Sequence, residues 1–251
     1  MTTTETPSPT QRAPDLSDQT VVVIGGSAGI GFATARAARA EGADVVLTGR
    51  NPERLEHAAT EIGARDTAAF DAVDIGRLER FFADLPTPVD HVLVTAGGPY
   101  YAPVPEFDFA MARRSLDEHV FLPIHIARLA MATVRPGGTL LFLGGTGARR
   151  PTAGAFAAAA TAALPALIAG LAVELAPIRV NLIAAGFVDT GLSASLLGDQ
   201  LDARRAELRA TLPIARVVGP EDVARLAVHL MTNTALTGAT YDIDGGQQLI
   251  A

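Results

Sequence analysis

The 251-residue chain contains no cysteine, no tryptophan and no lysine, and only three tyrosines. Without cysteine it can form neither disulfides nor thiolate metal sites, so cysteine usage gives no information on the compartment. The five histidines are scattered and lack the spacing of metal ligands, so we expect no metal site. With lysine absent, all 20 basic residues are arginine. Any chemistry that needs an amine side chain is therefore excluded.

Clustered positive charge is also missing. The net charge is −7 and the arginines are dispersed, which argues against a nucleic-acid partner. Residues 1–18 lack the apolar run of a signal peptide, so we interpret them as a flexible tail and expect a cytoplasmic protein. Residues 151–173 carry no charge, but they are mostly alanine and lie between two strand-like segments. This pattern favours a helix buried at a subunit interface over a membrane span.

Short β-branched runs alternate with helical stretches along the chain. This alternation is typical of repeated βαβ units. We therefore predict an α/β fold, a Rossmann-type doubly wound parallel sheet of about seven strands in a single domain, residues 19–251. The predicted strands are 20–24, 44–48, 67–70, 91–95, 139–143, 179–184 and 240–243. The predicted helices are 29–41, 52–62, 76–84, 107–134, 153–175 and 220–231. Segment 187–218 interrupts the pattern, either as a lid over the ligand crevice or as a connector.

A glycine-rich loop follows the first predicted strand and leads into a helix. It reads Gly25-Gly26-Ser27-Ala28-Gly29-Ile30-Gly31. Glycines let the backbone turn tightly and approach a pyrophosphate, whose charge is met by amide N–H groups and the helix dipole. The residues predicted to bind the cofactor here are Gly25, Ser27, Gly29, Ile30 and Gly31.

The end of the second strand indicates which nicotinamide cofactor binds. NAD sites usually have a carboxylate there for the ribose hydroxyls. This chain instead reads Thr48-Gly49-Arg50-Asn51. The forked guanidinium of Arg50 can hold a 2′-phosphate, so Arg50 and Asn51 predict NADP(H). The alternative is a surface arginine that begins the next helix.

In these motifs the chain resembles the short-chain dehydrogenase/reductase family over almost its whole length. The further matching motifs are Asp71-Ala72, Val94-Thr95-Ala96-Gly97, Arg179-Val180-Asn181, Ala185-Gly186-Phe187-Val188-Asp189-Thr190 and Tyr241-Asp242-Ile243-Asp244-Gly245-Gly246. The resemblance implies that Asp71 and Ala72 contact the adenine and that Ala96 and Gly97 lie beside the cofactor. It also implies cofactor contacts for Val188 and Thr190, and a homodimer or homotetramer.

The catalytic residues of that family are missing. Its members use a tyrosine acid tuned by a lysine four residues later, with a serine and an asparagine. The serine position falls on Gly144-Gly145 and the asparagine position on His119. The tyrosine and lysine positions fall on Ala157 and Thr161 or, one residue earlier, on Phe156 and Ala160. His119 is the remaining catalytic candidate, although a histidine on a helix is more often a packing residue.

The likeness to this family leaves the substrate open. Tyr100, Tyr101 and Phe187 are predicted to line its pocket, together with Phe156 and Leu192, which suggests an apolar ligand. The first hypothesis is an NADP(H)-dependent oxidoreductase that lacks the Tyr–Lys acid and acts on a small apolar carbonyl, imine or enone compound. The alternative is an inactive NADP(H)-binding or scaffold pseudo-enzyme. A cofactor-free lyase is disfavoured by Arg50 and the glycine loop.

Overall fold

The β-branched runs form the strands of one parallel sheet that is buried on both faces. The computed structural model describes residues 16–146, 149 and 154–250. In the first strand, Val21 and Val23 enter one hydrophobic core while Val22 and Ile24 enter the other, because successive side chains of a strand point to opposite faces. The strands are β1 (Thr20–Ile24), β2 (Asp44–Gly49), β3 (Asp66–Ala69), β4 (Val89–Val94), β5 (Val134–Gly145), β6 (Arg179–Ala185) and β7 (Thr240–Ile243).

The strand order is β3-β2-β1-β4-β5-β6-β7, with every pair parallel. Ile24 pairs with Thr48 on one side and Val94 on the other, so the carboxyl ends of β1, β2 and β4 lie level. The direction of the chain across the sheet reverses between β1 and β4. Such a reversal is where open α/β sheets bind their ligands. The predicted Rossmann-type sheet of seven strands is confirmed.

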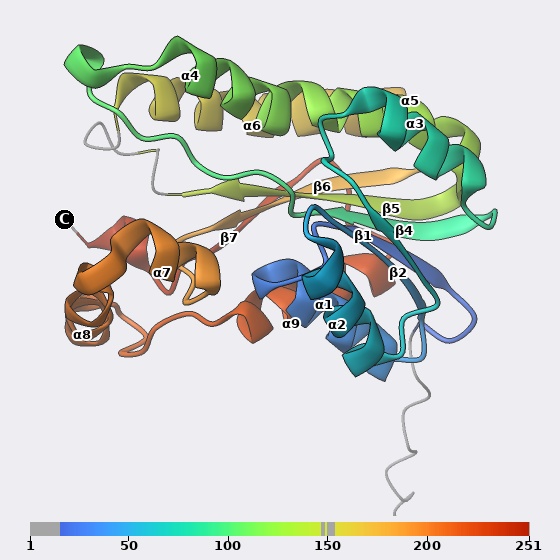
Figure 1. Ribbon diagram of the computed structural model, residues 1–251, viewed down its shortest axis with the longest axis horizontal. Coiled ribbons are helices and arrows are strands. Elements are labelled where there is room, and N and C mark those ends of the chain that lie inside the picture. The colour runs from blue at the N-terminus through green and yellow to red at the C-terminus, as the bar shows by residue number, and fades with distance from the viewer. Residues whose placement is uncertain (1–15, 147–148, 150–153, 251) are drawn as a thin grey trace, which may run out of the picture.

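Helices cover both faces of the sheet (Figure 1). One face carries α1 (Gly29–Ala40), α2 (Pro52–Ile62) and α9 (Pro220–Thr232), and the other carries α3 (Ile75–Asp84), α4 (Phe109–Leu116), α5 (Leu122–Thr133) and α6 (Ala155–Glu174). Short 3-10 turns are η1 (Val104–Glu106), η5 (Gly198–Gln200) and η6 (Gln247–Leu249).

The predicted continuous helix 107–134 is divided in the structure. A π-helical turn, η2 (Asp117–Phe121), separates α4 from α5, and the N–H of Leu122 donates to the carbonyl of Asp117 five residues back. Pro123 has no N–H to donate to the carbonyl of His119, so the regular helical ladder cannot continue through this point. The turn rotates the side chains of Glu118 and His119 relative to a straight helix.

The buried guanidinium of Arg179 anchors α9 to the sheet. From β6 it donates to the carbonyl oxygens of Leu230, Met231, Asn233 and Leu236 at 2.7–3.2 Å. These carbonyls belong to the end of α9 and the loop after it, where helix carbonyls lack partners of their own. A cation also suits the negative end of the helix dipole.

Segment 187–218 forms α7 (Gly191–Leu197) and α8 (Leu201–Thr211) beside the carboxyl ends of the strands (Figure 1). Arg205 of α8 holds Asp189 through two hydrogen bonds, Nε to Oδ2 at 2.9 Å and Nη2 to Oδ1 at 2.8 Å. The segment thus lies where either a lid over the crevice or a connector is expected.

The N-terminal boundary lies earlier than predicted. Leu16 is fully buried and its N–H donates to the carbonyl of Glu41, so residues 16–18 belong to the folded part rather than to a tail 1–18. Residues 1–15 lie outside the described part. The apolar helix α6 has the length and composition of a membrane span, but Leu164, Ile168 and Leu171 of this helix pack in the core as in a globular domain.

His91 of β4 is a buried histidine held neutral. It is 2 % exposed, its Nε2 lies 2.7 Å from Oε1 of Gln19, and its Nδ1 has no partner in the described chain. Burial, followed by the charges of Arg179 and Arg135, lowers the pKa of His91 from 6.5 to about 3. Between pH 6.5 and about pH 3, His91 is therefore neutral in the folded protein and protonated in the unfolded chain.

We predict that this pKa difference weakens the fold as the pH falls from 6.5 towards 3. At pH 5 the loss of unfolding free energy due to His91 should be about 2 kcal/mol. Urea denaturation at pH 8 and pH 5 measures it. His91→Gln should shrink the difference between the two pH values by that amount, whereas His57→Gln, on the exposed side of α2, should not. Equal pH dependence in wild type and His91→Gln would contradict the assignment.

Candidate active site

The glycine loop after β1 makes a turn that only glycine permits. Gly25 has φ +97°, and a Cβ on Gly31 would lie 2.3 Å from the carbonyl oxygen of Gly25. The hydroxyl of Thr95 at the end of β4 donates to that same carbonyl at 3.0 Å. The loop is thereby braced from across the point where the strand order reverses.

The N-terminus of α1 is open to an anion. Its N-cap residue, Ala28, supplies no side-chain hydrogen bond, and the first turn holds no acidic residue. By contrast, α2, α3 and α4 are capped by the side chains of Asn51, Asp74 and Asp108. The free amides and the positive helix end at Gly29, Ile30 and Gly31 therefore fit a pyrophosphate.

Arg50 lies directly beyond β2, with an exposed side chain that contacts no partner within the described residues. Gly49 packs close to Ser27 of the glycine loop, since a Cβ on Gly49 would lie 3.0 Å from Oγ of Ser27. Arg50 and the loop thus belong to one region. The side chain of Asn51 has a structural role, because its Oδ1 accepts the N–H of Arg54 at 2.8 Å and begins α2.

Asp71 is paired with Arg114, a residue that no sequence motif indicated. Nη2 of Arg114, on α4, lies 2.8 Å from both carboxylate oxygens of Asp71, and Nε of Arg114 donates to Oε1 of Glu118 at 2.7 Å. Oε2 of Glu118 accepts the N–H of Gly98 at 3.1 Å. Burial alone would lower the pKa of Arg114, but its hydrogen bonds and the charges of Glu118 and Asp71 raise it overall. The network is therefore a stable cation between two carboxylates.

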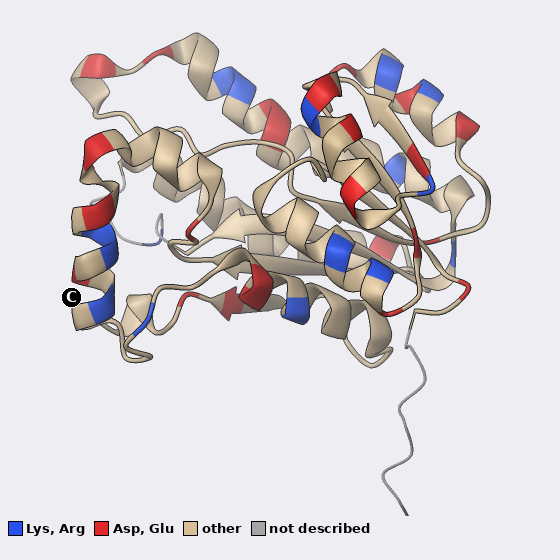
Figure 2. Ribbon diagram, turned by 60° about the horizontal axis from the view of Figure 1, so that its bottom comes forward, with Lys and Arg blue, Asp and Glu red and all other residues tan. Residues whose placement is uncertain are grey.

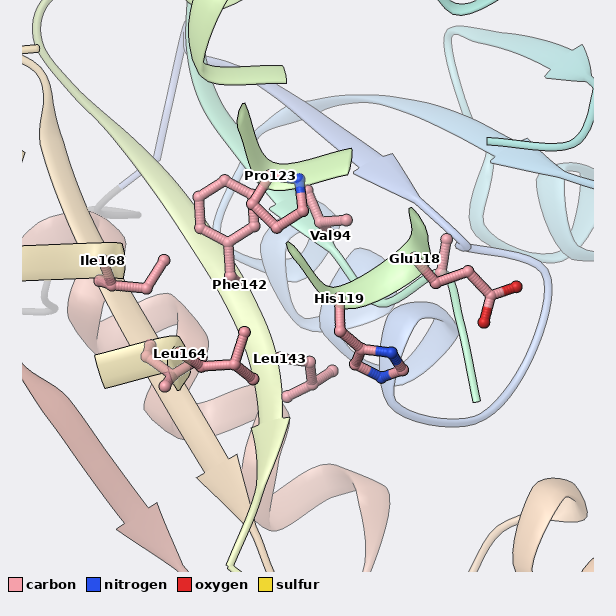
Figure 3. Close-up of a pocket in the computed structure, with 10 residues that line it drawn as sticks. Val94, Glu118, His119, Pro123, Phe142, Leu143, Leu164 and Ile168 are labelled. Carbon is pink, nitrogen blue, oxygen red and sulfur yellow. The ribbon is translucent and has the colours of Figure 1, made fainter. Parts of the chain in front are cut away.

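His119 lies on the π-helical turn and faces a small cavity. Its Nδ1 lies 2.9 Å from the carbonyl oxygen of Ser115, so Nδ1 carries the proton in the neutral ring and Nε2 holds the lone pair. The cavity, of about 10 Å³, has room for one water molecule. Figure 3 shows the imidazole beside Leu143, with the carboxylate of Glu118 turned away from it. The remaining lining is apolar and includes Ala96, Phe142 and Leu164.

The position of the family's serine is unfilled. A Cβ on Gly145 would meet only the carbonyl oxygen of Ala185, at 3.8 Å, so a larger residue would fit there. Gly144 is different, because a Cβ there would press on Leu164 at 3.1 Å. Gly145 is thus the position at the end of β5 where a side chain could stand.

Packing on α6 distinguishes the two alignments of the tyrosine position. Ala157 is 8 % exposed and shares one helix face with Thr161, Leu164 and Ile168, two of which line the cavity beside His119. Phe156 instead packs against the ring of Tyr100, with centroids 5.9 Å apart. The structure thus favours Ala157 and Thr161, rather than Phe156 and Ala160, as the residues that face the crevice.

Tyr100 and Tyr101, two of the predicted substrate residues, differ in how far neighbouring residues hold their side chains. The hydroxyl of Tyr100 accepts the N–H of Asp108 at 2.6 Å, and its ring packs edge-on against Phe107 and Phe156. Tyr100 is therefore held in place as a wall, although its hydroxyl accepts in this bond and keeps its own proton. Tyr101 is 54 % exposed.

The loop after β6 also approaches the glycine loop. Thr190 lies beside Gly29, where a Cβ would be 3.5 Å from Cγ2 of Thr190, and the same threonine caps α7. Val188 is buried and forms a β-bridge with Val218. Phe187 is half-buried, and its N–H donates to Oε1 of Gln247 at 3.0 Å. Ala72, after Asp71, is buried.

Among the residues that the structure describes, neither a charge cluster nor a set of metal ligands indicates a second kind of site. Figure 2 shows acidic and basic residues interspersed, for example along α8. In the described ranges, no group of three His, Asp or Glu side chains is arranged to hold a metal ion.

Comparison with known proteins agrees with this geometry. The family model described as enoyl-(acyl carrier protein) reductase matches residues 25–248. The short-chain dehydrogenase/reductase ATR9 of Stachybotrys chlorohalonatus is 30 % identical, over 93 % of this chain and 98 % of that protein. The solved structure of the MalC reductase/Diels-Alderase from Malbranchea aurantiaca superposes with a TM-score of 0.87 at 26 % identity, covering 95 % of this chain and 100 % of MalC.

A further solved structure carries a nucleotide. BdcA in complex with NADPH has a TM-score of 0.81 and 29 % identity, over 92 % of this chain and 95 % of BdcA. The motifs, the sheet topology and these matches along almost the whole chain lead to one conclusion. The chain belongs to the short-chain dehydrogenase/reductase superfamily of oxidoreductases.

Proposed function

We propose that the chain is an NADP(H)-dependent reductase whose acceptor needs no acid from the protein. The observation that carries the proposal is the contrast between the two halves of the crevice. The glycine loop, the uncapped α1 and the unpaired Arg50 suit a phosphorylated dinucleotide. The acid side holds Gly145, Ala157 and Thr161 at the positions of the family's serine, tyrosine and lysine.

The chain's own residues would bind and orient the cofactor. The first-turn amides of α1 would hold the pyrophosphate, Arg50 the 2′-phosphate, and Asp71 with Ala72 the adenine. Ala96, Gly97, Val188 and Thr190 would confine the nicotinamide end. When bound, NADPH supplies a hydride, and the protein contributes position and electrostatics.

The state of His119 restricts the acceptor. In its neutral form the Nδ1–H is donated to Ser115, so Nε2 has no proton to give to a substrate. A carbonyl needs both a hydride and a proton, whereas an iminium carbon takes the hydride alone and becomes a neutral amine. We therefore favour an imine in its iminium form over an enone or a ketone. The side chains around His119 are largely apolar, which suits an apolar group of the substrate at this end of the crevice.

The likeness to MalC supports chemistry without a tyrosine acid. That protein is described as both a reductase and a Diels-Alderase. A cycloaddition needs positioning of the reactants rather than proton transfer. It is therefore a second activity to test in the same crevice.

We also propose a cytoplasmic location.

Arg50 should determine the cofactor preference. Arg50→Gln should weaken NADPH binding about tenfold and leave NADH binding unchanged, because only the 2′-phosphate loses its partner. Cofactor fluorescence titration measures both affinities. Arg54→Gln, at an exposed arginine in the first turn of α2, serves as the matched control. A preference for NADH in wild type would contradict NADP(H) dependence.

The acceptor class is tested by mixing the NADPH-loaded protein with panels of iminium, enone and ketone compounds and following absorbance at the reduced nicotinamide band. We expect oxidation by iminium compounds and little by ketones. His119→Asn should leave iminium reduction within about threefold, since no proton from His119 is required. Tight NADPH binding without oxidation by any acceptor would instead support the inactive pseudo-enzyme.

The helical face away from the sheet predicts association. Large apolar side chains are exposed on α4, η2, α5 and α6, namely Phe109, Met111, Phe121, Met131 and Val173. We propose that this face is covered in a homodimer or homotetramer. Light scattering of the purified chain should give one of these masses, and Phe109→Arg with Val173→Arg should reduce it. A wild-type monomer at micromolar concentration would contradict the proposal.

A further inference from the structure

Arg114 joins two loops that are far apart in the sequence. Asp71 follows β3 at the outer edge of the sheet, while Gly98 follows β4 beyond the point of strand reversal. The guanidinium of Arg114 donates to Asp71 at 2.8 Å, and its Nε donates to Glu118 at 2.7 Å. Glu118 in turn accepts the N–H of Gly98. Arg114 and Glu118 together therefore link the loop after β3 to the loop after β4.

This guanidinium still has donors to spare. Nη2 serves Asp71 and Nε serves Glu118, but Nη1 has no partner in the described part of the chain. The Arg114 side chain is 33 % exposed, and that of Asp71 39 %. A carboxylate can accept about four hydrogen bonds, so Asp71 also keeps room for another donor. Side by side, the pair presents one acceptor and one donor to the crevice.

The place of the pair indicates what would lie against it. In doubly wound sheets each half of three strands binds one mononucleotide beyond the carboxyl ends of its strands, and the proposed function places the adenine at Asp71. Asp71 follows β3, the outer strand of the first half, and Arg114 contacts it from α4. A purine edge carries the complementary pattern, since adenine has an amine donor at position 6 beside a ring-nitrogen acceptor.

We propose that Arg114, together with Asp71, reads the edge of the cofactor's purine base. Asp71 accepts from the exocyclic amine, and Nη1 of Arg114 donates to the neighbouring ring nitrogen. This inference rests on the proposed NADP(H) dependence. Arg114 is then a specificity-determining residue for the base, a role distinct from the phosphate contact of Arg50.

The pair also makes a prediction that a lone carboxylate would not. Hypoxanthine has a carbonyl acceptor in place of the amine, and that acceptor would repel Asp71. Arginine is a good partner for a purine carbonyl and ring nitrogen, so Arg114 can compensate by donating to it. The hypoxanthine analogue of NADPH should therefore bind within about tenfold of NADPH itself.

The test measures the dissociation constants of four ligands, which are NADPH, its hypoxanthine analogue, 2′,5′-ADP and reduced nicotinamide mononucleotide. Arg114→Met should weaken NADPH and 2′,5′-ADP about tenfold and the hypoxanthine analogue about a hundredfold, with the mononucleotide unchanged. Arg113→Met, an exposed arginine one residue away without a described partner, is the matched control and should bind all four as wild type does.

Loop positioning is the competing role for Arg114. Glu118→Gln keeps an acceptor for Gly98 but removes the charge that faces Arg114, so it perturbs the loop side alone. If Arg114 acted only by holding the loop, Glu118→Gln and Arg114→Met would weaken the mononucleotide equally and spare 2′,5′-ADP, which would overturn the inference. Arg114→Lys keeps the charge without the fork. Arg114→Lys should raise the dissociation constant of the hypoxanthine analogue. If Arg114→Met does not fold, Arg114→Lys is measured in its place.

The outcomes separate the two proposals. NADPH binding by wild type, with unchanged or tighter binding by Arg114→Met, overturns base reading and leaves NADP(H) dependence standing. No NADPH binding by wild type overturns the proposed cofactor and this inference with it.

Discussion

Between β1 and β4 the order of the strands reverses, and the loops that leave these two strands diverge at the carboxyl edge of the sheet. Gly25 follows β1 and Thr95 follows β4, and the hydrogen bond between these two residues holds the two loops together. The uncapped start of α1 follows directly. The other site residues, from Arg50 to His119, come together at this edge because the strands beside the reversal end at the same level.

Because the chain has no lysine, its basic side chains are all arginines, but these arginines have different roles. Arg179 is buried and satisfies the carbonyls at the end of α9, so it stabilises the scaffold. Arg114 is shared between two carboxylates and joins loops. Arg50 has no partner within the described residues and is available for a ligand. An amine that could tune a phenol is excluded by composition alone.

We propose that the crevice is specialised on the side where the family's acid would stand. Small side chains at Gly145 and Ala157 remove the acid without disturbing the packing, because Leu164 and Ile168 on the same face of α6 still fill the core. The π-helical turn directs His119 towards the cavity, while its Nδ1 is committed to Ser115. We propose that a nucleotide site then lies beside an apolar end of the crevice, where His119 is the remaining imidazole.

The sequence by itself determined the alternation of strands and helices, the glycine loop and the loss of the tyrosine and lysine, because each is a local property of the chain. It could not place Arg114 against Asp71, since the two are 43 residues apart and meet only when the fold brings α4 beside the loop after β3. Nor could it choose between Phe156 and Ala157 in an alanine-rich helix without a marked polar face. Only the tertiary structure decided that, by supplying an aromatic partner for Phe156 and burying Ala157.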